Sequence, residues 1–139
     1  MTIKTVTLQL NTKGDAQVID ITSAVAKAIS DSNIESGIVT LFVPGSTAGL
    51  TTIEYESGAI EDFQRLFDEI ADPSRNYAHK ARWGDGNGHS HVRSALLGPS
   101  LTVPFTDSSL LLGTWQQIIL VDFDNRPRSR RVVVQIMGE

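Results

Sequence analysis

The chain has 139 residues, a length that suits one domain spanning residues 1–139 around a single hydrophobic core. Hydrophobic residues make up 40% of the sequence and charged residues 20%, which excludes an intrinsically disordered chain. A net charge of −4 argues against nucleic acid as a partner, and the absence of cysteine excludes disulfides and thiolate catalysis. No apolar run approaches the ~20 residues needed to cross a bilayer, so we expect a cytoplasmic protein with no membrane partner.

The first half of the chain is predicted to contain four strands and two helices. In chain order these are strands at 6–10 and 17–21, a helix at 22–32, strands at 37–43 and 50–55, and a helix at 58–71. Alternating or short apolar runs indicate the strands, and apolar residues at helical spacing indicate the helices. Thr22 or Ser23 can cap the first helix, and the turn at 11–14 should pair the first two strands.

The second half of the chain is predicted to be mainly strand. In chain order we expect an irregular segment at 75–88, a helix at 90–97, and strands at 100–105, 110–112, 115–122 and 130–137. Ser90 can cap the helix, and residues 124–127 are typical of a hairpin turn before the last strand. Strands joined by short turns, with a few helices inserted, predict an α+β fold with a largely antiparallel sheet or sandwich.

All three histidines of the chain fall within residues 79–91. His89 and His91 form a His-x-His pair, an arrangement that often binds a transition metal, and His79 supplies a third imidazole. Catalytic Zn²⁺ takes three protein ligands and keeps one open position. The window therefore predicts a site for a divalent metal ion, zinc or magnesium, although three separately solvated loop histidines would give the same pattern.

Residues 79–91 also have features that are typical of a site for a bound anion. Alternating glycines that end at Gly88 permit close backbone approach, as loops that hold phosphate require. A cap at Ser90 would place His91 at the first helical position, where unpaired N–H groups favour an anion. The glycines are equally typical of a flexible loop.

Hydroxyl, amide and guanidinium groups elsewhere in the chain are further candidates for phosphate contacts. Ser46 and Thr47 can serve a turn or hydrogen-bond a phosphate oxygen, and Gln116 can line a pocket. One arginine of the group at 126–131, such as Arg130, can hold phosphate, while the others lie at the surface or at subunit contacts.

Two acidic residues are candidates for the chemistry of the site. Glu54 interrupts a predicted strand between two apolar neighbours, and Asp62 lies about one turn into the following helix. A solvated surface position would explain either residue equally well.

Several longer motifs together resemble the YjbQ family. They are PGSTAGLTTIEYE at 44–56, YAH at 77–79, NGHSHVRSALLG at 87–98, GTWQQ at 113–117 and RSRRVVVQ at 128–135. They occur in order across nearly the whole chain, and the combination is more specific than any one motif. The resemblance implies a compact α+β domain that assembles as a homotrimer, with pockets near subunit boundaries.

The resemblance also implies an activity and its residues. Some family members are named secondary thiamine-phosphate synthases, transferases that join a pyrimidine diphosphate to a thiazole phosphate. By position, the family's histidines correspond to His79 and His91 and its acidic residues to Glu54 and Asp62. Where many relatives carry Asp in this motif, the present chain has His89.

Three functions are compatible with these residues. The first is a metal-assisted transferase in which metal, arginine and helix N-terminus stabilise a departing pyrophosphate. The second is a metal- or phosphate-binding protein with only incidental catalytic activity. The third is a metal-dependent hydrolase that uses the same ligands and a carboxylate base. The partner that we expect is a phosphorylated small molecule.

Overall fold

A computed structural model describes all 139 residues. Its elements, in chain order, are β1 (Thr2–Thr12), β2 (Gln17–Asp20), α1 (Thr22–Ser32), β3 (Gly37–Phe42), β4 (Ala48–Ile53), α2 (Ser57–Ile70), α3 (Ala78–Trp83), α4 (Gly88–Leu97), β5 (Ser100–Thr106), β6 (Ser109–Leu110), β7 (Gln117–Asp122) and β8 (Arg128–Gly138). Every strand pair is antiparallel. The expected α+β fold with antiparallel sheets is therefore confirmed.

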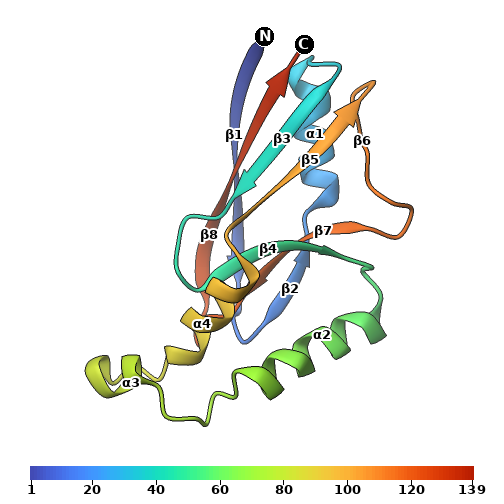
Figure 1. Ribbon diagram of the computed structural model, residues 1–139. Helices are drawn as coiled ribbons and strands as arrows, with labels where there is room; N and C mark the ends of the chain where they lie inside the picture. The colour runs from blue at the N-terminus through green and yellow to red at the C-terminus, as the bar shows by residue number, and fades with distance from the viewer.

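The strands form two sheets. The larger sheet has the order β1-β8-β3-β5-β6, and the smaller has the order β2-β7-β4. In Figure 1 the long strands of the larger sheet stand upright with α1 beside them, while the smaller sheet crosses their lower end. The helices α2, α3 and α4 lie at that lower end, beneath the smaller sheet. None of the four helices is both long and apolar enough to cross a membrane.

Two expected hairpins are wrong. β1 pairs with β8 and β2 pairs with β7, so the turn at 11–14 carries the chain from one sheet to the other. The turn after β7 also changes sheets, because β8 belongs to the larger one. Turn residues encode a reversal of direction, whereas the pairing is decided by burial: Ile118 to Val121 of β7 are fully buried, so both faces of this strand need a cover.

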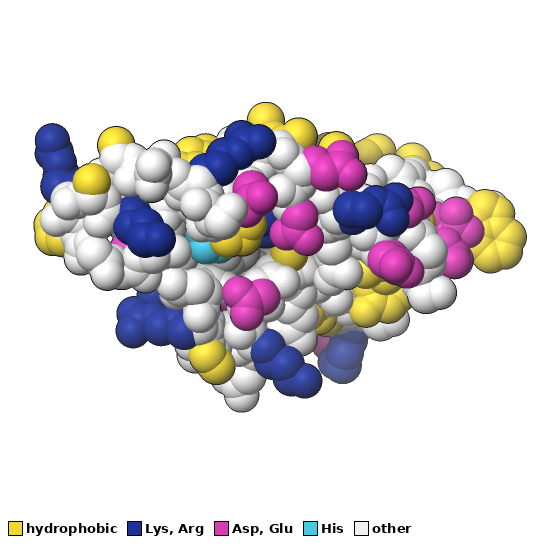
Figure 2. Space-filling view, turned by 90° about the horizontal axis from the view of Figure 1, so that it is seen from below, with side chains coloured by type: hydrophobic (Ala, Val, Ile, Leu, Met, Phe, Trp, Pro, Cys, Tyr) yellow, Lys and Arg dark blue, Asp and Glu magenta, His cyan; other side chains and the backbone are white.

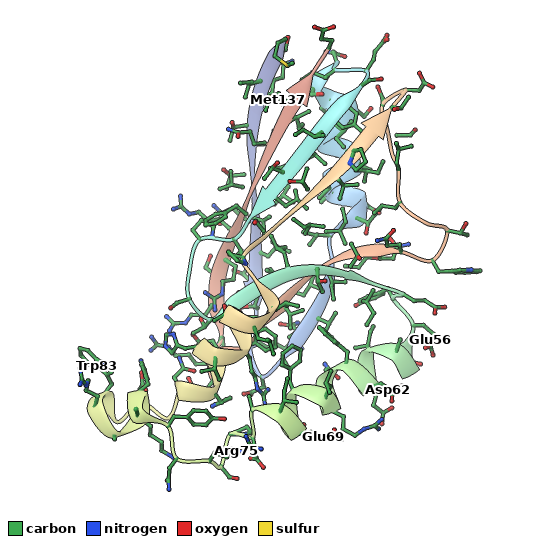
Figure 3. All side chains as sticks on the ribbon, in the orientation of Figure 1. Glu56, Asp62, Glu69, Arg75, Trp83 and Met137 are labelled. Carbon is green, nitrogen blue, oxygen red and sulfur yellow. The ribbon has the colours of Figure 1, made fainter.

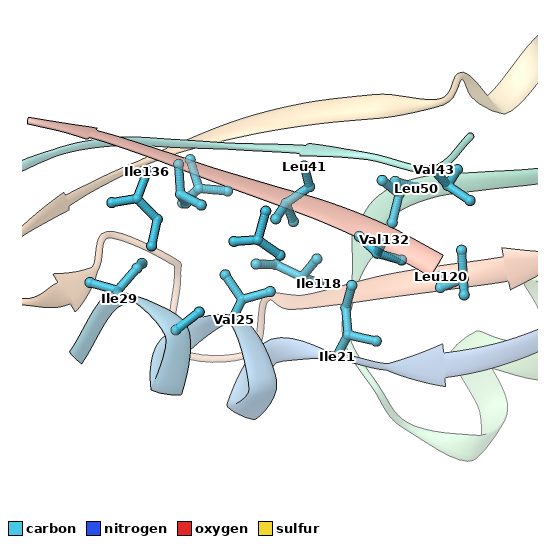
Figure 4. Close-up of a cluster of buried hydrophobic side chains, with 14 of the residues drawn as sticks. Ile21, Val25, Ile29, Leu41, Val43, Leu50, Ile118, Leu120, Val132 and Ile136 are labelled. Atoms are coloured by element: carbon cyan, nitrogen blue, oxygen red, sulfur yellow. The ribbon is translucent and has the colours of Figure 1, made fainter. Parts of the chain in front are cut away.

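The hydrophobic core has two parts, one on each face of the smaller sheet. The main part holds 17 buried residues between the two sheets and α1, including Val25, Leu41 and Ile118 (Figure 4). The second part holds six buried residues, among them Phe67 of α2 and Phe123. Burial of each such side chain contributes roughly 1.5–3 kcal/mol to the stability of the folded protein. The smaller sheet is therefore expected to hold the residues at its ends in fixed positions.

Two local expectations about helices are corrected by the structure. The residue before α1 is Ile21, and no side chain caps the helix there; the Asp20 carboxylate instead accepts hydrogen bonds from the Thr22 N–H and hydroxyl. The segment expected to be irregular contains α3, which buries none of its six residues. A helix without a buried face leaves no apolar periodicity in the sequence, which is why the pattern did not predict α3.

Candidate functional site

The helix α4 starts two residues before Ser90, the residue expected to cap it. Its N-cap is Asn87, whose side chain makes no capping hydrogen bond, and Gly88 is the first helical residue. A Cβ at Gly88 would clash with the Tyr77 side chain, so close packing requires glycine there. His91 is consequently the fourth residue of α4, one turn further from the helix end than expected.

The structure brings two of the three histidines together. The ring centroids of His79 and His91 lie 4.3 Å apart, with 42° between the ring planes. His79 is supplied by α3 and His91 by α4, so contact between these two helices forms the pair. The Asp85 carboxylate lies 3.4 Å from His79 Nδ1, within range of an ion pair when this imidazole is protonated.

His89 lies away from this pair. It is buried, with 6% of its surface exposed, and its ring faces Tyr77 at a centroid distance of 6.3 Å. Residues two apart on a helix point in directions that differ by roughly 200°, so a His-x-His pair in a helix cannot converge on one ion. Burial, assisted by the charge of Arg93, lowers the pKa of the His89 imidazole.

The expectation of a metal-binding site is therefore wrong. The structure contains no group of three His, Cys, Asp or Glu side chains that could hold a metal ion. His79, His89 and His91 were expected to bind zinc or magnesium from an irregular or extended segment, but the helical geometry of α4 directs His89 away from the other two. A metal-dependent hydrolase would need the same ligand group, so that alternative loses its structural basis as well.

A small pocket lies beside α4, next to the histidine pair. Its cavity volume is about 350 Å³, and it is lined by Gly45, Ser46, His91, Ser94, Ala95 and Pro99. We call it the α4 pocket. Figure 2 shows the molecule from below, where a small area of histidine surface is visible among basic, acidic and hydrophobic side chains. The pocket thus lies between the turn after β3, the helix α4 and the residue Pro99 that follows this helix.

Arg130 reaches the wall of the α4 pocket from β8. Its Nε donates to Asp122 Oδ2 at 2.7 Å, and its Nη2 donates to Asp122 Oδ1 at 3.0 Å and to Thr47 Oγ1 at 2.6 Å. Nη1 has no hydrogen-bond partner in the chain. A Cβ added at Gly45 would lie 3.1 Å from Nη1, so this free donor group lies against the pocket wall.

A second buried carboxylate completes the network around Arg130. Asp124 Oδ2 accepts hydrogen bonds from Thr47 Oγ1 at 2.9 Å and from Arg128 Nε at 3.0 Å. Burial opposes the negative charge of Asp124, but these hydrogen bonds and the nearby guanidinium groups outweigh it and lower the pKa of the carboxyl. Asp122 and Asp124 therefore balance the charges of Arg128 and Arg130.

The two acidic residues expected in the site lie elsewhere in this chain. Glu54 lines a different cavity of about 390 Å³ together with Trp115. Glu54 follows β4 and Thr47 precedes it, and a strand of six residues separates its ends by roughly 20 Å. Asp62 is exposed on α2 and pairs with Arg65 at 2.6 Å. Figure 3 shows Asp62 on α2, well apart from α3.

The remaining candidates divide between the α4 pocket and other places. Ser46 lines the α4 pocket. The Thr47 hydroxyl is already used by Asp124 and Arg130. Ser90 is fully buried and its Oγ has no partner. Gln116 donates to Thr52 Oγ1 and lines a separate groove between β4 and β5.

Asp122 and Asp124 were not predicted as site residues. The sequence does carry a signal for them: two aspartates with a spacing of two end an apolar strand, and two arginines with the same spacing open the next strand. Side chains two apart in an extended segment point to the same side. Matching pairs of opposite charge on neighbouring segments therefore predict a network of buried ion pairs.

A family model described as "UPF0047 protein YjbQ-like" matches residues 6–139. The chain belongs to the YjbQ-like family. A UPF0047 protein from Methanothermobacter thermautotrophicus is 37% identical over 139 residues, which cover 100% of this chain and 95% of that protein. The UPF0047 protein YugU of Bacillus subtilis is 34% identical over 134 residues, which cover 95% of this chain and 98% of YugU.

Solved structures of YjbQ-like proteins share the fold. A YbjQ-like protein of unknown function from Sulfolobus solfataricus is similar with a TM-score of 0.89 and 32% identity, covering 99% of this chain and 100% of that one. A hypothetical protein from Aeropyrum pernix is similar with a TM-score of 0.90 and 30% identity, covering 98% and 99% of the two chains.

Membership of the YjbQ-like family is confirmed, but the expected description of the chain as a thiamine-phosphate synthase and transferase is corrected. The curated relatives carry only the name UPF0047 protein, and the Sulfolobus relative is described as a protein of unknown function. The chain also lacks the metal-ligand group on which the expected transferase chemistry depended.

Proposed function

We propose that this YjbQ-like protein binds the phosphate group of a small phosphorylated molecule in the α4 pocket. The observation that carries the proposal is the free Nη1 of Arg130 at the wall of a small pocket that also holds Ser46 and His91. Phosphate oxygens accept several hydrogen bonds, and a guanidinium is well suited to donate them.

The other donors of the α4 pocket fit the same ligand. The Ser46 hydroxyl has no partner in the chain and can donate to a phosphate oxygen, whereas Thr47 is occupied by Asp124 and Arg130. A neutral imidazole donates one hydrogen bond, so His91, with His79 packed against it, can add another donor. The lining of the pocket thus offers hydroxyl and imidazole donors, and the Arg130 guanidinium lies next to Gly45 in its wall.

Charge balance favours recognition by directed hydrogen bonds. The carboxylates of Asp122 and Asp124 cancel the charges of Arg128 and Arg130, so the network attracts anions only weakly over a distance. Binding then depends on donor geometry, which favours an oxyanion over a spherical anion such as chloride. The homotrimer implied by the family resemblance stays a separate prediction.

Calorimetric titration of the purified protein with inorganic phosphate and with a small phosphate monoester tests the proposal. We expect saturable binding to the wild-type protein and several-fold weaker binding to Ser46→Ala and His91→Gln. Ser129→Ala is the matched control for Ser46→Ala, since Ser129 is exposed on β8. Equal affinities of wild type and both pocket variants would contradict the proposal.

A further inference from the structure

We propose that Asp122 is a positioning residue that holds the Arg130 guanidinium in the one orientation that presents Nη1 to the α4 pocket. This inference rests on the proposed phosphate site and extends it to a residue that does not itself reach the ligand. Asp122 is fully buried, while Arg130 keeps 8% of its surface exposed.

The contact between the two side chains fixes the guanidinium. Asp122 accepts one hydrogen bond from Nε and one from Nη2, at 2.7 Å and 3.0 Å. A guanidinium is planar and rigid, so two anchored nitrogens determine the position of the third. The third nitrogen is Nη1, and it is the one that lies against Gly45. A second bond from Nη2 to Thr47 Oγ1 holds the same edge of the group.

Asp122 is itself held from two directions. The Thr12 hydroxyl donates to its Oδ2 at 2.5 Å from β1, and the backbone N–H of Asp124 donates to its Oδ1 at 2.9 Å. As the last residue of β7, Asp122 also lies between Gln17 of β2 and Ala48 of β4 in the sheet register. The carboxylate therefore has little freedom, and a rigid acceptor transmits its position to Arg130.

Substituting Asp122 by Asn separates a positioning role from a role in charge balance. The variant raises the net charge of the buried network by one, so charge alone predicts tighter binding of phosphate. Asn keeps only one of the two acceptor oxygens and places an NH2 donor where the other was, so the guanidinium can reorient and a positioning role predicts weaker binding. The two explanations thus predict opposite signs for the same measurement.

The first experiment compares calorimetric binding of inorganic phosphate to wild type and Asp122→Asn. We expect affinity to fall about tenfold, the size of effect typical for a lost hydrogen bond to a charged group. Asp107→Asn, in the exposed turn between β5 and β6, removes the same charge away from the pocket and is expected to bind like wild type. Unchanged or tighter binding by Asp122→Asn overturns the inference.

The second experiment measures guanidinium rotation directly by NMR of the Arg130 Nε–Hε and Nη groups without any ligand. We expect slow rotation in wild type and faster rotation in Asp122→Asn; equal rates overturn the inference. If wild type does not bind inorganic phosphate, the proposed function fails, and the rotation rates still decide whether Asp122 holds Arg130.

A milder variant covers the case in which Asp122→Asn does not fold. Thr12→Val removes one hydrogen bond to Asp122 and changes no charge. We expect a smaller loss of phosphate affinity and faster guanidinium rotation, both restored in Thr12→Ser, which keeps the hydroxyl. Rotation and affinity in Thr12→Val that equal those of wild type count against the inference.

Discussion

The imidazoles of His79 and His91 lie against each other, with ring centroids 4.3 Å apart, although they belong to different helices. This contact joins the exposed helix α3 to α4, and it places His79 next to the residue that lines the α4 pocket. The surface segment between α2 and α4 is thereby tied to the candidate site.

The first prediction concerns the contact between His79 and His91. His79→Ala removes the ring contact, and α3 buries none of its own residues, so we expect local opening of α3 without global unfolding. Hydrogen exchange should speed up at residues 78–83, while the melting temperature stays nearly constant. His79→Phe keeps an aromatic ring and serves as the control. Exchange at 78–83 that matches wild type in the alanine variant would contradict the prediction.

The second prediction concerns the turn after β3. Gly45 has a φ of +134°, and a Cβ there would lie 3.1 Å from Arg130 Nη1. Gly45→Ala should therefore cost about 1–3 kcal/mol of stability through backbone strain and also obstruct the free donor. Phosphate titration and urea unfolding of the same sample measure both effects.

Gly98→Ala is the matched control for Gly45→Ala. Gly98 has a φ of +96°, but no atom lies within 4 Å of an added Cβ. We expect the control to lose stability and to keep its affinity for inorganic phosphate. If both variants bind phosphate as well as wild type, Arg130 Nη1 is not a donor to the ligand.

The third prediction concerns pH. The pKa of His89 is lowered in the folded protein, chiefly by burial, so the unfolded chain takes up the proton first as pH falls. Neutral His89 stabilises the fold fully at pH values above the pKa of histidine in the unfolded chain, which is about 6.5. This stabilisation is lost as the pH falls from there towards the pKa of His89 in the folded protein. Urea unfolding at pH 7.5 and 5.5 should show this loss, and His89→Gln should reduce it. An unchanged pH slope in the variant would falsify the assignment to His89.

The fourth prediction concerns Asp124. The pKa of Asp124 is lowered in the folded protein. Its negative charge therefore stabilises the fold at pH values above the pKa of aspartate in the unfolded chain, which is about 3.9. This contribution disappears as the pH falls through the pKa of Asp124 in the folded protein. Asp124→Asn takes the charged partner from Arg128, which is 36% exposed and can be hydrated, so the cost at pH 7 should be about 2 kcal/mol. The difference from wild type should vanish in strong acid. Asp107→Asn provides the surface control, and equal stability of both variants at pH 7 would rule out the network role.

The fold class was predictable from the sequence because its signals are local. Period-two runs gave most strands, and the stripe of Ile60, Phe63 and Phe67 gave α2. The helix α3 was not predictable in this way, since a helix without a buried face has no apolar period. Strand pairing was not predictable either, because β1 meets β8 across the whole length of the chain.

The candidate site shows the same division. The sequence by itself determined the residue types and the family, and its histidine window pointed to His79 and His91. His89 turns away from that pair because α4 begins at Gly88, earlier than the sequence predicted, whereas only the tertiary structure, through strand pairing, brought the free guanidinium of Arg130 to Gly45. The local sequence pattern determines which segments become helices and strands. Which distant side chains come into contact depends instead on how the strands pair into two sheets that bury both faces of β7.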